Sequence, residues 1–198
     1  MADPDRAVGG RAAADPRKAH LIRIIEERSL WRQADFELVS GAASTFYFDM
    51  KPTAFDPEGA SLIAELILEA LAADRVDLIG GLEMGAVPIV ACVCQLSHSR
   101  AKPIAGFFVR KEAKDHGTKR LIEGVPREQE LAGKHAVLVE DVTTTGGSVL
   151  AAVRAARDAG CRVSKVVTVV DRLQGAGDNL RTHGLELVAL LSAADFDL

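Results

Sequence analysis

The sequence predicts an α/β protein with a mostly parallel central sheet flanked by helices. Short apolar segments typical of strands alternate with segments of helical periodicity. The strand segments are apolar on both faces, as in a parallel sheet that is covered on both sides. The chain has 198 residues, 48% of them hydrophobic and 26% charged, which suits one folded domain. We expect this domain over residues 18–198, after a flexible tail over residues 1–17 that is rich in Ala, Asp, Arg and Gly.

The first predicted elements are a helix, a strand and a second helix. Residues 18–29 carry apolar side chains at near-helical spacing, whereas residues 44–50 alternate and include aromatic residues, as in a strand. Asp56 and Pro57 form a helix start, with an N-cap residue before proline at the first helical position. The apolar side chains after Pro57 recur at the spacing of a helix up to Leu71.

The rest of the chain predicts the remaining strands and two more helices. Strands are expected at 76–79, 104–109, 136–139, 163–170 and 185–191. The first of these breaks at Gly80 and Gly81, and a helix is expected over 87–96. Another helix covers 148–159 and ends at Gly160, a residue favoured at helix C-termini. Because ligands of such sheets bind beyond the carboxyl ends of the strands, the segments that follow the strands are the candidate site.

Composition argues against several classes of function. The chain has 24 Lys and Arg against 28 Asp and Glu, a net charge of −4, whereas nucleic-acid-binding proteins carry a basic excess. No segment approaches 18 consecutive apolar residues and the N-terminus lacks a signal-peptide core, so we expect a cytoplasmic protein without a membrane anchor. Cys92, Cys94 and Cys161 lack the spacing of a zinc site or a disulfide framework, and are expected to be buried thiols.

The strongest functional pattern follows the predicted strand at 136–139. Glu140 and Asp141 come first, and a Thr/Gly loop and a helix start follow them. Hydroxyls, backbone N–H groups and a helix N-terminus can hold a phosphate, while the two acids suit the hydroxyls of a sugar or a magnesium ion. A sugar phosphate satisfies both halves, and a plain strand-to-helix turn is the alternative. The residues after the acids are Val142, Thr143, Thr144, Thr145, Gly146, Gly147 and Ser148.

Three other segments also follow strands. Residues 80–88, the glycine-rich loop, contain three glycines that permit close approach of a second phosphate or merely shape a turn. Residues 110–120, the basic loop, carry five cations and two acids, a local charge of +3, which suits a pyrophosphate or a solvated loop. Arg172 can bind a ligand carboxylate with two N–H groups, or pair with its neighbour Asp171.

Together these segments resemble the type I phosphoribosyltransferases, and among them the orotate phosphoribosyltransferases. Residues 140–148 are similar to the family's motif for phosphoribosyl pyrophosphate (PRPP). Residues 110–117 are similar to its mobile catalytic loop, and residues 40–49 to its orotate-contacting segment. The resemblance extends from about Phe36 to Arg172. It implies the family's fold, with a small hood formed by the N-terminal and C-terminal parts.

The resemblance implies that orotate and PRPP react to orotidine 5′-monophosphate and pyrophosphate, a step of UMP biosynthesis. It implies Mg²⁺ as the cofactor, bound mainly through PRPP with no metal ligand assigned in the protein. It also implies a homodimer with shared active sites, because the family's catalytic loop closes partly over the neighbouring subunit. Three alternatives remain: a phosphoribosyltransferase for another base, a PRPP-sensing regulator without catalysis, and a phospho-acceptor receiver domain, which leaves the basic loop unexplained.

The resemblance also implies roles for individual residues. The candidate catalytic residues are Lys114, His116 and Asp141. The PRPP-binding residues are Arg110, Lys111, Lys114 and His116 at the pyrophosphate, Glu140 and Asp141 at the ribose, and 142–148 around the 5′-phosphate. The orotate contacts are Tyr47, Phe48, Thr144 and Arg172. Val39 and Gly85 stand where the family often has lysine, and Lys51 is a candidate for the missing cation.

Overall fold

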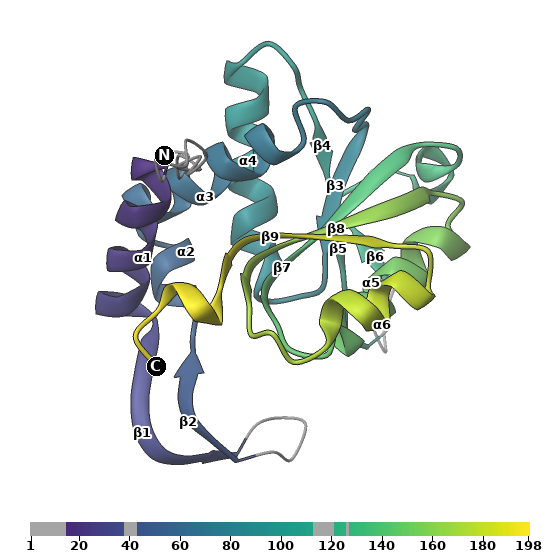
Figure 1. Ribbon diagram of the computed structural model, residues 1–198. Helices are drawn as coiled ribbons and strands as arrows, with labels where there is room; N and C mark the ends of the chain where they lie inside the picture. Colours follow the sequence, from purple (N-terminus) through teal and green to yellow (C-terminus); the bar gives the residue numbers. More distant parts are fainter. Residues whose placement is uncertain (1–14, 38–42, 113–120, 126) are drawn as a thin grey trace, which may run out of the picture.

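A five-stranded parallel sheet lies at the centre of the computed structural model, which describes residues 15–37, 43–112, 121–125 and 127–198 (Figure 1). In spatial order the strands are β4 (Ala105–Gly106), β3 (Leu78–Gly81), β7 (His135–Thr143), β8 (Arg162–Asp171) and β9 (Glu186–Ser192). Each neighbouring pair is parallel. The predicted fold class is confirmed.

Helices cover both faces of this sheet. On one face lie α1 (Pro16–Arg28), α3 (Pro57–Ala70) and α4 (Ala86–Ser99), and on the other lie α5 (Gly147–Asp158) and α6 (Ala176–Thr182). Neighbouring residues of β7 alternate between these layers, since Val137 and Val139 pack toward α3 and α4 while Leu138 packs toward α5. This double burial explains the continuous apolar strand segments. No helix of the described ranges has the length and apolar character needed to cross a lipid bilayer.

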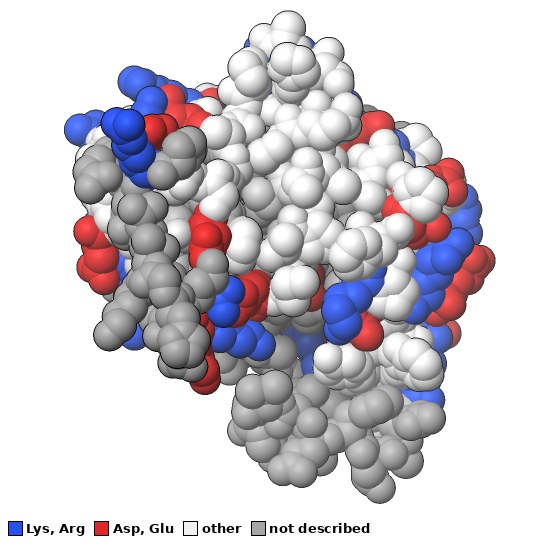
Figure 2. Space-filling model, turned by 180° about the vertical axis from the view of Figure 1, so that it is seen from behind, with Lys and Arg blue, Asp and Glu red and all other residues white. Residues whose placement is uncertain are grey.

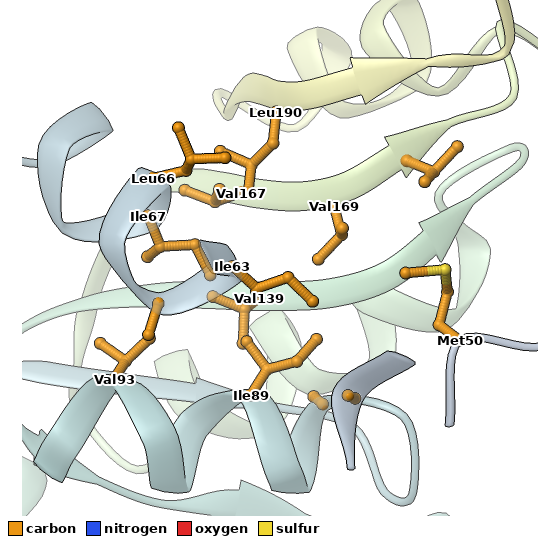
Figure 3. Packing of buried hydrophobic residues seen from close by; sticks show 14 of the residues in the cluster. Met50, Ile63, Leu66, Ile67, Ile89, Val93, Val139, Val167, Val169 and Leu190 are labelled. Atoms are coloured by element: carbon orange, nitrogen blue, oxygen red, sulfur yellow. The ribbon is translucent and has the colours of Figure 1, made fainter. Parts of the chain in front are cut away.

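The core on the α3 and α4 side holds the ends of the central strands in place. Figure 3 shows Ile63 of α3 and Ile89 of α4 directed at Val139 of β7, with Val169 of β8 beside them. All four side chains are at most 2% exposed. Residue 139 immediately precedes the acidic pair, so this packing positions the sheet edge on which the candidate site is built.

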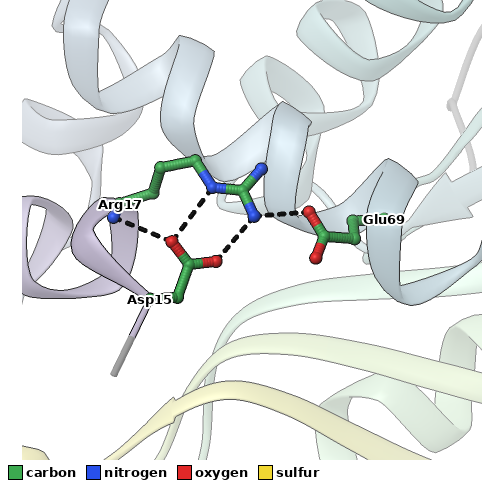
Figure 4. Close-up of polar contacts among 3 residues, drawn as sticks. All are labelled: Asp15, Arg17 and Glu69. Carbon is green, nitrogen blue, oxygen red and sulfur yellow. Dashed lines mark hydrogen bonds and ion pairs between the residues drawn. The ribbon is translucent and has the colours of Figure 1, made fainter. Parts of the chain in front are cut away.

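The first helix begins at Pro16, two residues before the predicted start. The carboxylate of Asp15 accepts hydrogen bonds from the backbone N–H of Arg17, at 2.9 Å, and from its guanidinium. The same guanidinium pairs with Glu69 of α3 (Figure 4). The described part of the chain therefore starts with a polar connection between α1 and α3.

A two-stranded antiparallel arm projects from the body, formed by β1 (Leu30–Glu37) and β2 (Ala43–Phe48) (Figure 1). β1 was not predicted from the sequence. The short helix α2 (Lys51–Ala54) follows the arm. At its base, the ring of Phe48 packs edge-on against Phe196 near the C-terminus, with centroids 5.0 Å apart. The N-terminal and C-terminal parts thus lie together, as the expected hood requires.

Two of the predicted strands differ from the structure near the glycine-rich loop. β3 does not break at Gly80 and Gly81 but includes both residues. The predicted strand at 104–109 is divided into β4 and β5 (Phe108–Val109), and β5 pairs with β6 (Ile122–Glu123) in a separate small sheet. Phe107, which lies between β4 and β5, explains why a glycine stands at position 80. Its ring lies where a side chain of residue 80 would stand, 2.3 Å from an ideal Cβ, so only glycine continues the strand there.

Candidate active site

Glu140 and Asp141 lie inside β7, because this strand continues to Thr143. The predicted end of the strand at residue 139 is therefore wrong. Parallel pairing with β8 continues past both acids, as far as Thr143 opposite Asp171. The backbone of the acidic pair is consequently held by the central sheet and not by a loop.

Both acids are partly buried and carry perturbed pKa values. Burial raises the pKa of Glu140 from 4.5 to about 7, although the Thr143 hydroxyl donates to its Oε2 at 3.0 Å and opposes the rise. Burial also raises the pKa of Asp141, opposed by the backbone N–H of Val142, which donates to Oδ1 at 2.9 Å. Poorly solvated carboxylates of this kind accept hydrogen bonds from ligand hydroxyls in place of water.

A tight turn connects β7 to α5. Gly146 precedes the helix with φ +80°, a left-handed conformation that only glycine adopts without cost. The side-chain amide of Asn179, on α6, donates to the carbonyl oxygen of Thr145 at 2.7 Å and supports the turn from outside. The N-terminus of a twelve-residue helix thus follows directly after the threonines, which is the arrangement that binds phosphate groups.

The glycine-rich loop lies against the acidic pair, since β3 and β7 are neighbours in the sheet. A Cβ added to Gly85 would stand 2.3 Å from the Oδ2 of Asp141. A side chain at position 85 and the observed position of this carboxylate therefore exclude each other. The peptide bond between Glu83 and Met84 in this loop is cis.

The base of the basic loop is attached to the glycine-rich loop. The N–H of Arg110 donates to the carbonyl of Leu121 at 2.8 Å and closes the base beyond β5 and β6. Next to it, the N–H of Lys111 donates to the Glu83 carboxylate at 2.9 Å, and the N–H of Glu83 donates to the carbonyl of Val109 at 2.8 Å. Arg110 and Lys111 are thereby placed beside the glycine-rich loop.

Two predicted site residues, Lys114 and His116, lie outside the described residues. Their assigned roles stay predictions, as do those of the other site residues. In the described part of the chain no group of three or more His, Cys, Asp or Glu side chains is arranged to hold a metal ion.

Arg172 follows β8 and lies beneath the arm. Its backbone N–H donates to the carbonyl of Thr143 at 2.9 Å, which joins it to the end of β7. The residue is only 5% exposed, and its guanidinium carbon lies 4.4 Å from the ring centroid of Phe46. Burial lowers the pKa of the guanidinium, while Tyr47 opposes this electrostatically. Two more of the predicted orotate contacts, Tyr47 and Phe48, lie on β2 of the arm. Tyr47 is 41% exposed and Phe48 is buried.

Lys51 lies at the start of α2 and interacts electrostatically with Asp141 of the acidic pair. Its ammonium group forms an ion pair with Asp49 at 2.5 Å. Asp49 raises the pKa of Lys51 most strongly, and Tyr47 and Asp141 raise it further. The structure therefore places a cation in the electrostatic field of Asp141.

Two residues near the site were missed by sequence reasoning. Glu83 holds the base of the basic loop, and it is the only acid between residues 80 and 99, which was an available signal. Phe46 lies over Arg172, and no sequence pattern marked it, because a cation–π pair joins residues far apart in the chain.

Comparison with known proteins agrees with this arrangement. The chain matches the family described as the phosphoribosyl transferase domain over residues 53–183. It is 52% identical over 179 residues to the orotate phosphoribosyltransferase of Bradyrhizobium sp. (strain ORS 278), covering 90% of this chain and 96% of that protein. The corresponding enzyme of Sorangium cellulosum (strain So ce56) is 39% identical over 190 residues, which cover 93% and 95% of the two chains.

Solved structures give the same result. The Mycobacterium tuberculosis orotate phosphoribosyltransferase in complex with Fe(III) dicitrate superposes with a TM-score of 0.79 at 36% identity, covering 92% of this chain and all of that one. The same enzyme in complex with PRPP superposes with a TM-score of 0.75 at 33% identity and the same coverage. With this match over most of its length, the chain belongs to the phosphoribosyltransferase family, in the group of the orotate phosphoribosyltransferases.

Proposed function

We propose that the protein transfers the phosphoribosyl group of PRPP to orotate and releases orotidine 5′-monophosphate and pyrophosphate, as an enzyme of UMP biosynthesis. The observation that carries this proposal is the junction of β7 and α5. Partly buried acids at residues 140 and 141, a left-handed Gly146 and a helix N-terminus follow one another there. This order of groups suits a ribose 5-phosphate, whose hydroxyls and phosphate lie at opposite ends of one molecule.

PRPP is proposed to bind along this junction. The carboxylates of Glu140 and Asp141 accept hydrogen bonds from the ribose hydroxyls. Backbone N–H groups and hydroxyls between Thr143 and Ser148 surround the 5′-phosphate, aided by the partial positive charge of the α5 N-terminus. The pyrophosphate extends toward the base of the basic loop and the glycine-rich loop, which lie side by side.

Orotate is proposed to bind under the arm. Arg172 offers two parallel N–H groups to the orotate carboxylate, a geometry that distinguishes a planar anion from a neutral base. The backbone near Tyr47 and Phe48 and the side chain of Thr144 complete the pocket for the ring. The ring nitrogen then attacks the anomeric carbon while pyrophosphate leaves.

Catalysis is proposed to depend on cations that gather around the departing pyrophosphate. Arg110, Lys111, Lys114 and His116 supply them, with Lys51 as a further cation near Asp141. Preorganised donors stabilise charge that develops only in the transition state, and loss of one such donor typically lowers the rate by about 10²–10³-fold.

Mg²⁺ is proposed to arrive with PRPP. This ion prefers oxygen ligands and usually retains water while it binds substrate phosphates. The carboxylates of Glu140 and Asp141 favour a divalent cation nearby through their charge, and the ion when bound neutralises the leaving pyrophosphate.

A homodimer is proposed to form through the exposed face of α4. The helix contains no Lys, Arg, Asp or Glu, and Figure 2 shows it as part of a broad uncharged surface. Ala91 and Gln95 lie exposed on this face.

Size-exclusion chromatography with light scattering tests the proposed dimer interface. Ala91→Glu should convert a dimer to monomers, because it would place a charge between the two copies. A wild-type monomer, or a variant that stays dimeric, would reject it.

The decisive test of function is consumption of orotate in the presence of PRPP and Mg²⁺. Arg172→Ala should raise KM for orotate far more than KM for PRPP, because the proposed contact is with orotate alone. Preference for a different base would favour another phosphoribosyltransferase. Folded protein that binds PRPP without turnover would favour a regulator.

A further inference from the structure

We infer that Phe46 is a positioning residue for recognition of the orotate carboxylate, acting through Arg172. This inference rests on the proposed function, because it concerns the geometry of the residue that would bind orotate. The arm, which carries Phe46 on β2, therefore orients a side chain of the proposed orotate site. Phe46 holds the plane of the guanidinium in the orientation that a bidentate contact requires.

The contact between the two residues is direct. The guanidinium carbon of Arg172 lies 4.4 Å from the centroid of the Phe46 ring, well within the roughly 6 Å over which a cation is attracted to an aromatic face. Arg172 is 5% exposed. Removal from water strengthens a cation–π contact, because water no longer competes for the charge.

The ring of Phe46 is itself supported from behind. It packs edge-on against Phe48, with centroids 5.7 Å apart, and Phe48 packs edge-on against Phe196, with centroids 5.0 Å apart. Phe48 and Phe196 are both buried. This aromatic cluster of Phe46, Phe48 and Phe196 therefore joins the arm and the C-terminal segment into one support for the Arg172 guanidinium.

A fixed guanidinium plane matters because of the ligand that it meets. Two parallel N–H groups match a carboxylate only when the guanidinium plane and the carboxylate plane are aligned. Free rotation of the Arg172 side chain would therefore reduce the fraction of protein molecules whose guanidinium is oriented for orotate binding. The backbone of Arg172 is already held by its hydrogen bond to Thr143. Phe46 supplies the constraint at the other end of the side chain.

The experiment replaces the ring and measures the two Michaelis constants separately. Phe46→Leu should raise KM for orotate by about 5- to 30-fold and change KM for PRPP less than about 2-fold, since the ring lies against Arg172, the proposed orotate contact. Phe46→Tyr keeps the aromatic face and should stay within about 2-fold of wild type. Phe55→Leu is the matched control, because Phe55 is 71% exposed at the end of α2.

A double-mutant cycle separates positioning from general packing. In an Arg172→Ala background, Phe46→Leu should add less than about 2-fold to KM for orotate, because the residue it positions is gone. If Phe46→Leu does not fold, Phe46→Met provides the same loss of ring with a more adaptable side chain.

Three results would overturn the inference: an unchanged KM for orotate in both non-aromatic variants, an equal rise in both Michaelis constants, or a full additional penalty in the Arg172→Ala background. Failure of the proposed function is distinguishable from these, because wild-type protein would then consume no orotate at all.

Discussion

Gly85 lies directly against the carboxylate of Asp141, and an added Cβ would come within 2.3 to 2.6 Å of all three carboxyl atoms. The glycine-rich loop and the acidic strand end are thus fitted to each other at a single position. In this chain the absence of a side chain at residue 85 is what allows the carboxylate its place beside the proposed ribose site.

Gly85→Ala should therefore displace the Asp141 carboxylate and lower kcat/KM for PRPP by about 10- to 100-fold, because small displacements of positioning groups carry large kinetic costs. Steady-state kinetics with varied PRPP measures this effect. Gly177→Ala is the matched control, since its added Cβ meets no atom within 4 Å. Equal kinetics in the two variants would contradict the proposed role of Asp141.

Glu140 should make the free protein less stable as pH rises. Its pKa is 4.5 ordinarily and about 7 in the folded protein, so the folded state retains a proton that the unfolded state loses between these values. Stability contributed by this group is present below pH 4.5 and declines until pH 7, by roughly 3 kcal/mol at most. Thermal unfolding of wild type and Glu140→Gln at pH 5 and pH 8 measures it. The Tm of Glu140→Gln relative to that of wild type should be higher at pH 8 than at pH 5.

The same carboxyl group should make PRPP binding pH-dependent. The ionised carboxylate of Glu140 is a stronger hydrogen-bond acceptor than the protonated carboxyl group, so affinity for PRPP should increase as pH rises through about 7. Calorimetric titration with PRPP in the absence of orotate, between pH 6 and pH 8, tests this. Glu140→Gln should bind more weakly and lose this pH dependence, and an unchanged profile in the variant would assign the titration to another group.

Glu83 should affect turnover through the base of the basic loop. Its carboxylate accepts the N–H of Lys111, and Glu83→Ala removes that acceptor while Glu83→Gln keeps one. We expect kcat to fall by about 3- to 10-fold in the alanine variant, which corresponds to the net value of roughly one hydrogen bond. The glutamine variant should stay close to wild type. Similar kcat values for the alanine variant and wild type would show that this attachment is not needed for catalysis.

Two acidic residues near α3 should differ in their effect on stability. Asp56 caps the helix by accepting the N–H groups of Glu58 and Gly59, and it pairs with Arg28 at 3.0 Å. Asp56→Ala should cost about 1–2 kcal/mol and lower Tm by several degrees. Glu69→Gln weakens only an exposed ion pair and should change Tm little. Thermal denaturation compares them, and a larger loss for Glu69→Gln would contradict this ranking.

Local patterns predicted the elements whose causes are local. Asp56 and Pro57 mark the start of α3 because capping involves residues two and three positions away. Likewise Gly160, with φ +89°, follows the end of α5 as its position in the sequence predicted. Such signals are contained in a few consecutive residues and need no knowledge of the tertiary structure.

The wrong boundaries have causes that lie far away in the chain. Gly80 and Gly81 look like a strand break, yet they continue β3 because both pair with β7. The Phe107 ring and the Ala86 methyl group leave no room for a side chain at these two positions. Glu140 and Asp141 look like the end of β7, yet β8 pairs alongside them. The contact between Phe46 and Arg172 joins residues on different elements, so periodicity and spacing contain no trace of it.

The β5 and β6 pair stands outside the five-stranded sheet and brings the two ends of the basic loop to one place. Closing a longer loop at such a base costs only about 0.6 kcal/mol per doubling of its length. A change in the length of the segment between Arg110 and Leu121 should therefore cost the fold little stability. Insertions or deletions in this segment should leave the pairing of β3, β7 and β8 intact, because β5 and β6 lie in a separate sheet.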